Sequence, residues 1–273
     1  SPKSRSLETL RQQLGDATSI PPLGHLPVTV PGTVDGWFQL HQRFGSLPMA
    51  SVLAPAIRYA RDGFPVSPVI AYYFKRAEAA FNRRLDMIDE FDNANRTYFQ
   101  PHAPKAGEIF RNPDLANTYA TIAQQGRDAF YEGSIAKTID AYMQRIGGDL
   151  RLADLVAHKS EWVTPSCAAY RDVELCELPP NGQGFAALQM VNILKHANLA
   201  QWQRDDPRVW HYLTEAKRLA FEDVAKYYAD PEFANVPTEW LLSEAYGKAR
   251  FDLIDPEKAM LPVSYTHLRA HET

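Results

Sequence analysis

The sequence predicts a mainly helical α+β protein with a few short strands and one hairpin. Three observations support this fold class. A side chain that can cap a helix stands directly before a proline at three places, and such a pair marks a helix start. The three pairs are Ser67-Pro68, Asn112-Pro113 and Asp206-Pro207. Apolar residues recur at helical spacing behind several starts, whereas runs typical of strands are short and scattered.

Three helices have clear apolar stripes. One follows Pro68, one follows Gly133 and stops at Gly147, and the longest runs from about Pro207 to Tyr228. The stripes, in chain order, are Ile70, Tyr73, Phe74, Ala77 and Phe81; Ile135, Ile139, Tyr142, Met143 and Ile146; and Val209, Tyr212, Leu213, Ala216, Ala220 and Val224.

Two further features of the helices are predicted. Arg218 and Glu222 lie one helical turn apart, so we expect them to pair on the outer face of the longest helix. A helix that begins at Pro48 contains Pro55. Because an interior proline lacks the N–H group that the helix needs, we expect a kink or a restart there.

Strands are expected at residues 28–30, at residues 161–164 and in the two arms of a hairpin whose turn is Arg171-Asp172. Residues 90–110 have no consistent period and are predicted to form a long loop. These strands are too few to close a sheet. Two interpretations follow: a helical bundle with a small hairpin, or a fold whose partner strands lie outside this chain.

The only two cysteines, Cys167 and Cys176, lie symmetrically about the hairpin turn. In a two-residue hairpin this register places them opposite each other in a non-hydrogen-bonded pair, with Cα atoms ~4.5–6.5 Å apart. The pair is therefore close enough to form a disulfide. Two cysteines do not make a disulfide scaffold, however, and two reduced, half-buried thiols are the favoured prediction.

The segment ELPPNGQGFAALQMVNILK, residues 177–195, raises the question of phosphate binding. A strand end, a loop with Gly182 and Gly184 and an amphipathic helix follow one another, and this order can cradle a phosphate. The loop matches neither phosphate-binding glycine motif, no lysine follows it, and its two prolines remove N–H donors. We therefore predict a structural turn.

Composition narrows the classes of function. Apolar residues make up 45% of the chain and charged residues 23%, as in globular proteins. The net charge of −4 and the lack of a basic run argue against nucleic acid as a partner. No apolar stretch approaches the ~18 residues of a membrane helix. The first ten residues lack the apolar core of a signal peptide, and the compartment stays unassigned.

Eight histidines invite a search for metal and acid–base sites, but no catalytic or zinc-binding motif is present. His41, His196 and His211 fall in predicted amphipathic helices and are expected to be surface or internally satisfied residues. His267 and His271 have the spacing of two metal ligands, without a third. We assign no catalytic, substrate-binding or metal-ligating residue and no cofactor.

Several blocks, in order, resemble the large subunit of gamma-glutamyltransferases. The first is VTVPGTVDGWFQLHQRFGSLPMASVLAPAIRYARDGFPVS. The others are PDLANTYATIAQQGRDAFYEGSIAKTI, RLADLVAHKSEW, YRDVELCELPPNGQGFAALQMVNIL, RVWHYLTEAKRLAFEDVAKYYADPEF and LLSEAYGKARFDLID. Each block is weak alone, but together they cover most of residues 26–255. Many members have two serines and two glycines where this chain has NGQG, and there the segment is a structural corner.

The resemblance implies an N-terminal nucleophile hydrolase with an αββα fold. In that family a precursor cleaves itself, and the new N-terminal threonine of the small subunit becomes the nucleophile. Its free amine can act as the base for its own hydroxyl group. The gamma-glutamyl group of glutathione passes to that threonine and then to water or an amino acid. The implied partners are gamma-glutamyl compounds and the small subunit, and most of the sheet belongs to the small subunit.

The resemblance also places the family's main functional residues outside this chain. The substrate-binding arginine falls just upstream of Ser1, and Arg5 does not match it. We therefore interpret residues 1–257 as an internal fragment of the large subunit that is inactive alone. Residues 258–273 are expected to be a non-native tail, in which Thr266-His267 matches the family nucleophile only by coincidence.

Two alternatives remain open: a cephalosporin (glutaryl) acylase of the same fold, and a non-catalytic helical interaction module. Acceptor preference and oligomeric state are not predicted. Because the partner sheets would lie elsewhere, we expect apolar faces without partners around Tyr73, Leu213 and Met190.

Overall fold

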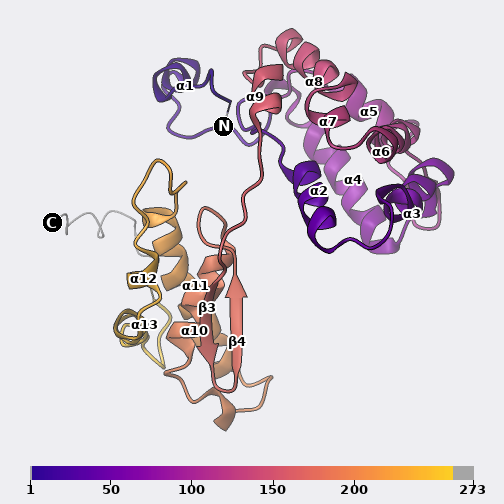
Figure 1. Ribbon diagram of the computed structural model, residues 1–273. Coiled ribbons are helices and arrows are strands. Elements are labelled where there is room, and N and C mark those ends of the chain that lie inside the picture. Colours follow the sequence, from indigo (N-terminus) through magenta and orange to yellow (C-terminus); the bar gives the residue numbers. More distant parts are fainter. Residues whose placement is uncertain (1, 261–273) are drawn as a thin grey trace. The chain divides into compact units, whose positions relative to one another are not determined.

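The computed structural model describes residues 2–260. The chain divides into two compact units, Ser1–Ser160 and Glu161–Thr273 (Figure 1). No helix of the described residues is long and apolar enough to cross a bilayer. The sequence blocks described above fall on the helices, strands and loops of these two units.

The first unit is helical apart from one short antiparallel ribbon, in which Phe64 pairs with Phe110 and Pro65 with Ile109. Its helices are α1 (Leu7–Leu14), α2 (Thr33–Phe44), α3 (Met49–Asp62), α4 (Pro68–Asn82), η1 (Leu85–Met87), α5 (Asp92–Tyr98), α6 (Pro113–Gln125), α7 (Asp128–Tyr131), α8 (Ser134–Arg145) and α9 (Leu152–Ala157). The ribbon consists of β1 (Phe64–Pro65) and β2 (Ile109–Phe110).

The core of the first unit forms where α2, α3, α6, α7, α8 and α9 turn apolar side chains toward one another. The buried members of this cluster are Val34, Leu53, Ile122, Tyr131, Ala136, Met143, Leu150 and Leu155. Burial of each large side chain contributes ~1.5–3 kcal/mol, so this cluster is the main stabilising feature of the unit.

The predicted helix starts are confirmed. The side chains of Ser67, Asn112 and Asp206 each accept a hydrogen bond from a backbone N–H group in the first turn of their helices. The helix does not restart at Pro55, because α3 continues through this residue. An interior proline costs ~3 kcal/mol, and the close packing of α3 against α6 through buried residues such as Leu53 offsets that cost.

The long loop predicted for residues 90–110 is wrong in part, because α5 and β2 lie within it. Aromatic contacts order this segment: Phe91 and Phe99 both contact Phe81 of α4, and Tyr98 stacks on Phe110. Such contacts join residues far apart in the sequence and leave no local period. The predicted strand at residues 28–30 is also absent; Val28 and Val30 pack against the core without a partner strand.

The second unit consists of a hairpin and the helices that follow it. Its elements are β3 (Ser166–Tyr170), β4 (Val173–Glu177), α10 (Gly184–Leu194), η2 (Leu199–Gln201), α11 (Pro207–Tyr227), α12 (Thr238–Leu241) and α13 (Glu244–Phe251). Helix α10 contacts β3, β4, α11 and α13, and is therefore the central element of this unit. The strand predicted at residues 161–164 is absent.

The hairpin has the predicted register. Cys167 pairs with Cys176 and Tyr170 with Val173, and Arg171 begins the turn with a left-handed φ of 56°. The prediction of two reduced, half-buried thiols is wrong: the cysteines form a disulfide, and both are exposed. Their Cα atoms are 4.1 Å apart, slightly below the expected range.

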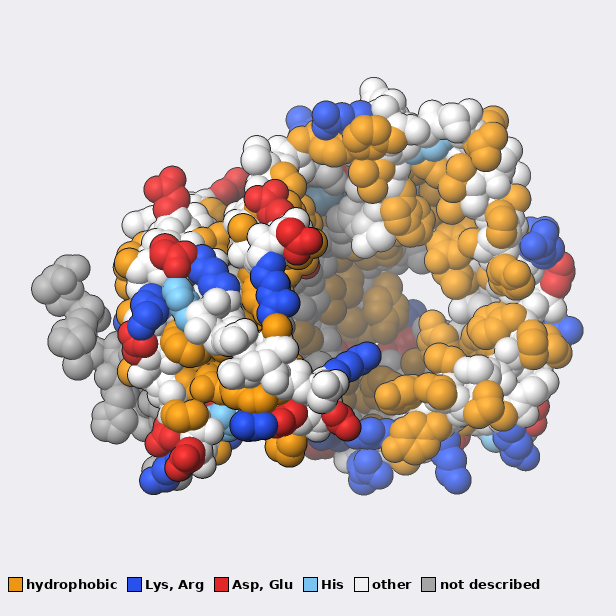
Figure 2. All heavy atoms as spheres, turned by 90° about the horizontal axis from the view of Figure 1, so that it is seen from below, with side chains coloured by type: hydrophobic (Ala, Val, Ile, Leu, Met, Phe, Trp, Pro, Cys, Tyr) orange, Lys and Arg blue, Asp and Glu red, His pale blue; other side chains and the backbone are white. Residues whose placement is uncertain are grey.

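The predicted exposure of apolar stripes holds for one helix and fails for two. On α4, 63% of Val69 and 56% of Tyr73 is exposed, and Ile70 and Tyr72 are exposed as well. Leu213 and Met190, in contrast, pack against a cluster around Ile193 within the second unit. Figure 2 shows one face of the molecule, on which hydrophobic side chains fill wide areas between the charged groups.

Replacement of exposed residues of α4 should therefore leave the fold stable. We expect Val69→Thr combined with Tyr73→Gln to change the free energy of unfolding by less than ~0.5 kcal/mol, as is usual for surface substitutions. Binding of a dye specific for exposed apolar surface should fall. Val66, of which only 2% is exposed, is the control: Val66→Thr buries a hydroxyl group and should cost ~1–3 kcal/mol. A double variant as unstable as the control would mean that α4 is covered within this chain.

Candidate functional site

Buried charged groups are the strongest indicators of function in the described residues, because perturbed pKa values gather at functional sites. Two networks of such groups each join several segments, and the buried carboxylates of Asp154 and Glu215 bond separately from them. The Asp35 network lies in the first unit and the Asp223 network in the second. Their geometry shows what each can do.

The Asp35 network joins three segments of the first unit. Asp35 lies in the first turn of α2 and is only 1% exposed. Its carboxylate accepts hydrogen bonds from Nε of Arg127 and, at 2.5 Å, from the backbone N–H of Ser160. Arg127 also donates to the carbonyl oxygen of His158 at 2.6 Å. The carboxylate thereby holds the start of α2, the start of α7 and the end of the unit together.

Tyr131 completes this network from the other side. Its hydroxyl group donates to the carbonyl oxygen of Pro31 at 2.8 Å and accepts from the N–H group of Asp35 at 3.1 Å. The ring of His158 stacks on the Tyr131 ring, with Nε2 3.8 Å from a carboxylate oxygen of Asp35. A carboxylate beside an imidazole can orient a general base, but the neighbouring hydroxyl group of Tyr131 already donates to the backbone of Pro31.

Electrostatics agree with a structural role for Asp35. Burial alone would raise the pKa of Asp35, but the hydrogen bonds from Arg127 and Ser160 outweigh it and hold that pKa below its usual value. Burial would lower the pKa of Arg127, but the bond to Asp35 raises it. Both groups are therefore charged, and each stabilises the other.

The Asp223 network joins α10, α11 and α13. Asp223 is 2% exposed, and its carboxylate accepts from Gln189 at 2.7 Å, from the hydroxyl group of Tyr246 at 2.7 Å and from Arg250 at 3.3 Å. The Gln189 side chain in turn accepts from the hydroxyl group of Tyr228 at 2.6 Å. Three helices are thus connected through one carboxylate.

Burial has the larger effect at this second carboxylate. It raises the pKa of Asp223 despite the opposing influence of Arg250 and the hydrogen bonds from Tyr246 and Gln189. Burial also raises the pKa of both Tyr228 and Tyr246. A raised carboxyl pKa is a feature of general acids, but both Asp223 oxygens accept bonds from neighbouring side chains and the residue is enclosed. The network therefore supports the fold and offers no group to a substrate.

The expected pair of Arg218 and Glu222 is wrong. Arg218 contacts Glu215 at 3.1 Å, and Glu222 binds Arg250 at 3.0 Å. Glu215 is buried and also accepts from the backbone N–H of Met260 at 3.0 Å, while Arg218 donates to the Met260 carbonyl oxygen at 2.6 Å. Because α13 packs against α11, Glu222 turns toward that contact and away from the outer face.

The chain is closely packed at the corner before α10. A side chain at Gly184 would place its Cβ 2.4 Å from a carboxylate oxygen of Glu177, so the end of β4 approaches the first residue of the helix closely. The helix N-terminus favours negative charge. The Glu177 carboxylate therefore lies close to the first residue of this helix.

Of the three histidines expected to be surface or internally satisfied, His41 and His211 have hydrogen-bond partners, whereas Nε2 of His196 is buried without one among the described residues. His41 lies in α2 and bonds the Leu47 carbonyl oxygen at 2.6 Å, and His211 lies in α11 and bonds that of Asp255 at 2.7 Å. His196 follows α10 and lies 3.4 Å from Glu244. Among the hydrogen bonds of residues 2–260, none joins a Ser, Thr or Cys side chain to a histidine, the pairing that can activate a nucleophile. Thr266, His267 and His271 lie outside the described residues.

Comparison with known proteins identifies relatives across the whole chain. The family model described as gamma-glutamyltranspeptidase matches residues 1–273. The glutathione hydrolase-like YwrD proenzyme of Bacillus subtilis is 35% identical over 221 residues, which cover 81% of this chain and 41% of that protein. The chain thus spans about two fifths of the length of the curated glutathione hydrolase proenzymes that it matches.

Two solved structures share the fold. The cephalosporin acylase of Bacillus halodurans has a TM-score of 0.83 at 38% identity, covering 93% of this chain and 47% of that chain. The gamma-glutamyltranspeptidase of Pseudomonas nitroreducens, complexed with L-DON, has a TM-score of 0.82 at 31% identity, covering 96% and 76%. The networks described above are therefore embedded in the fold of both kinds of enzyme.

The Asp35 network should stabilise the protein in a pH-dependent way. Asp35→Asn breaks a buried ion pair and should cost ~3–5 kcal/mol at neutral pH. Because folding lowers the pKa of Asp35, its contribution is present above the unfolded pKa of ~3.9 and is lost as the pH falls through the folded value. Urea unfolding should therefore show a gap between wild type and Asp35→Asn that narrows below about pH 4.

Asp128 provides the matched control, because this exposed carboxylate also contacts Arg127, at 3.4 Å. Asp128→Asn should cost no more than the ~0–1 kcal/mol of a surface ion pair. Hydrogen exchange of the amide groups in residues 31–35 would localise the effect. Equal destabilisation by the two substitutions would contradict the importance of the buried pair.

The contact of Met260 with Glu215 predicts where the second unit tolerates truncation. A chain that ends after Met260 keeps the backbone donor to the buried carboxylate, whereas a chain that ends after Glu257 loses it. We expect the shorter chain to be less stable by ~1–3 kcal/mol than the chain that ends after Met260, as for a buried acceptor left unpaired. Glu215→Gln should reduce this difference, measured by thermal unfolding. Equal melting temperatures for the two truncations would contradict the prediction.

Proposed function

Because the chain belongs to the gamma-glutamyltranspeptidase family, we propose that it is part of the large subunit of an enzyme that cleaves glutathione. The enzyme would transfer the gamma-glutamyl group to water or to an amino acid or peptide. The observation that carries this proposal is the match of the family model to the whole chain, together with the fold shared with a gamma-glutamyltranspeptidase. The fold is that of the N-terminal nucleophile hydrolases.

The proposed chemistry is acyl transfer through a covalent intermediate. The N-terminal threonine of a small subunit, freed by self-cleavage of a precursor, would attack the gamma-glutamyl carbonyl group with its hydroxyl oxygen. Its α-amine would take the hydroxyl proton and then deliver it to the leaving amine. Water or an acceptor amine would attack the resulting ester and regenerate the threonine. No residue of this chain is assigned a catalytic role in these steps.

The contribution of this chain would be to support the sheets that carry the nucleophile. Its described strands form only two-stranded ribbons, so each strand has one edge with unpaired backbone groups. The exposed apolar residues of α4, among them Val69 and Tyr73, form a further surface that a partner could cover. Both features support a small subunit as the partner.

A second candidate function is acylase activity toward glutaryl cephalosporins. The observation in its favour is the cephalosporin acylase of Bacillus halodurans, with 38% identity and a TM-score of 0.83. A glutaryl group differs from a gamma-glutamyl group by the absence of the α-amine. The two candidate enzymes would therefore carry out the same acyl transfer and would differ in the protein group that recognises the substrate.

Activity assays separate these proposals. The complete open reading frame that contains this segment should yield a precursor that cleaves itself into two polypeptides. The product should hydrolyse a gamma-glutamyl anilide faster than a glutaryl cephalosporin, and the reverse order would favour the acylase. A precursor that neither cleaves itself nor turns over either substrate would contradict both candidates and favour an interaction module.

The chain by itself should show no turnover of the gamma-glutamyl anilide above a heat-inactivated control, because the covalent route needs a nucleophile on the small subunit. The Thr266→Ala variant is the matched test of the tail. Turnover by the chain that this substitution abolishes would show that Thr266 is a nucleophile after all.

A further inference from the structure

The outward face of the hairpin brings together three groups that can bind a metal ion. Cys167, Cys176 and Glu174 all occupy non-hydrogen-bonded positions of the ladder, since Cys167 pairs with Cys176 and Ala169 with Glu174. Side chains alternate between the two faces of a hairpin, so these three share one face. The opposite face carries Ala168, which is buried against α10.

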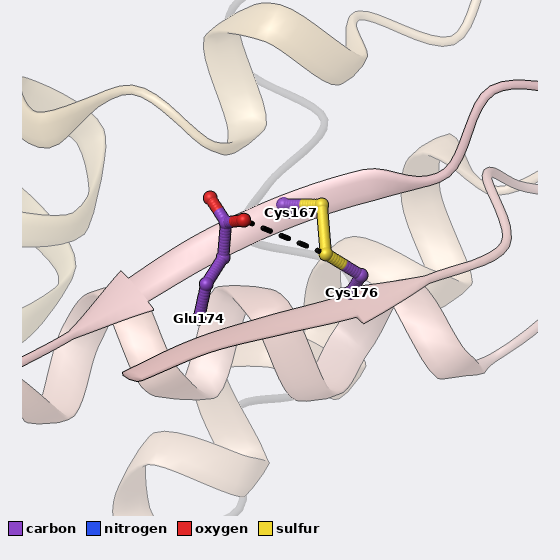
Figure 3. The surroundings of a disulfide bond; sticks show 3 residues. All are labelled: Cys167, Glu174 and Cys176. Carbon is purple, nitrogen blue, oxygen red and sulfur yellow. Dashed lines mark hydrogen bonds between the residues drawn. A yellow bond between two sulfur atoms is a disulfide. The ribbon is translucent and has the colours of Figure 1, made fainter. Parts of the chain in front are cut away.

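The three groups are exposed and close together. One sulfur or oxygen atom from each residue lies within 4.8 Å of the others, and Sγ of Cys176 is 3.9 Å from Oε2 of Glu174 (Figure 3). In the disulfide neither sulfur carries a proton, so this contact is not a hydrogen bond. The carboxylate is thus next to the sulfur atoms without being engaged by them.

The separation of Glu174 from Cys176 fits a tetrahedral zinc ion. With Zn–S bonds of ~2.3 Å and a Zn–O bond of ~2.1 Å, tetrahedral angles place sulfur and oxygen ~3.6 Å apart and the two sulfurs ~3.8 Å apart. The distance from Glu174 to Cys176 is already 3.9 Å. The two sulfurs must separate once the disulfide is reduced, and because both cysteines are exposed, their side chains can rotate without displacing the core.

We propose that the reduced hairpin binds one zinc ion through Cys167, Cys176 and Glu174, and that the disulfide closes this site. A dithiol reductant supplies two electrons and two protons to the Sγ–Sγ bond, becomes a cyclic disulfide and leaves two protein thiols. Zinc then displaces both thiol protons and binds two thiolates and the carboxylate. Water fills the fourth position, as in zinc sites with three protein ligands.

Reduction makes the site, so the test compares the same chain in two redox states. The chain is reduced with a dithiol, freed of it by gel filtration under argon, and titrated with Zn²⁺ against a chelating dye. We expect one zinc ion per reduced chain, released when the disulfide is restored. Titration with Co²⁺ should produce a thiolate-to-metal charge-transfer band in the reduced chain only. A reduced chain that gives no such band would overturn the proposal.

Single substitutions identify the ligands. Glu174→Gln should weaken zinc binding by at least the ~10-fold that loss of even an outer-shell partner causes. Asp172→Asn, which changes an exposed carboxylate at the turn of the same hairpin, should leave the affinity unchanged. Cys167→Ser with Cys176→Ser keeps His267 and His271 and should lose the site. Equal affinity of this double variant and the reduced wild type would assign the metal to other residues and overturn the proposal.

The reduced chain and the variants should retain the helical circular dichroism signal of the disulfide form. This signal, measured on each sample, separates loss of a zinc ligand from loss of the fold. The hairpin is held on α10 by Ala168, Phe185 and Leu188, which do not depend on the disulfide. Glu174→Gln leaves both cysteines in place, so unchanged zinc affinity in that folded variant would exclude the carboxylate as a ligand and contradict the proposed site.

Discussion

A buried carboxylate needs hydrogen-bond donors inside the fold, and in each unit of this protein such a carboxylate joins several segments of the chain. Asp35 obtains its donors from Arg127 and from the backbone of Ser160, and so fixes segments that lie more than ninety residues apart in the sequence. Asp223 obtains its donors from two other helices. The apolar clusters supply most of the stabilising free energy, whereas the carboxylates specify which segments meet.

The two carboxylates satisfy the same constraint in different ways. At Asp35, the charged donor Arg127 and the N–H group of Ser160 keep the pKa low and the group ionised. At Asp223 the donors are an amide and a phenol, with Arg250 farther away at 3.3 Å, and burial raises the pKa. A perturbed pKa here reflects how the fold balances burial, and the family's chemistry is proposed to come from a nucleophile on another subunit.

Several exposed surfaces, unlike the two buried carboxylate networks, carry groups that could bind a partner. The two ribbons have free edges, α4 exposes apolar side chains, and the hairpin exposes sulfur and carboxylate groups on one face. In the N-terminal nucleophile hydrolase fold, strands and helices cover one another in layers. Surfaces of this kind are expected where one segment contributes a layer and another segment contributes the sheet.

The sequence by itself determined the helix starts, the hairpin register and the family. Capping by Ser67 and Asn112 depends on neighbouring residues, and the pairing of Cys167 with Cys176 depends only on a two-residue turn, so both could be predicted correctly. Only the tertiary structure decided the unbroken helix at Pro55 and the helix α5. Packing against α6 offsets the cost of the proline, and aromatic contacts from distant residues order α5.

The buried networks also depended on the tertiary structure. No site residue was assigned from the sequence, and Glu222 was expected to pair with Arg218, because an i, i+4 spacing predicts contacts only along one helix. The actual partner, Arg250, comes from α13, and local spacing carries no information about it. The disulfide also depended on the tertiary structure. The sequence placed the two cysteines opposite each other, but only the folded hairpin, with Cα atoms 4.1 Å apart, showed that they are bonded. Neighbouring residues determine local geometry, whereas the packing of helices that are distant in the sequence determines the partner of a buried charge.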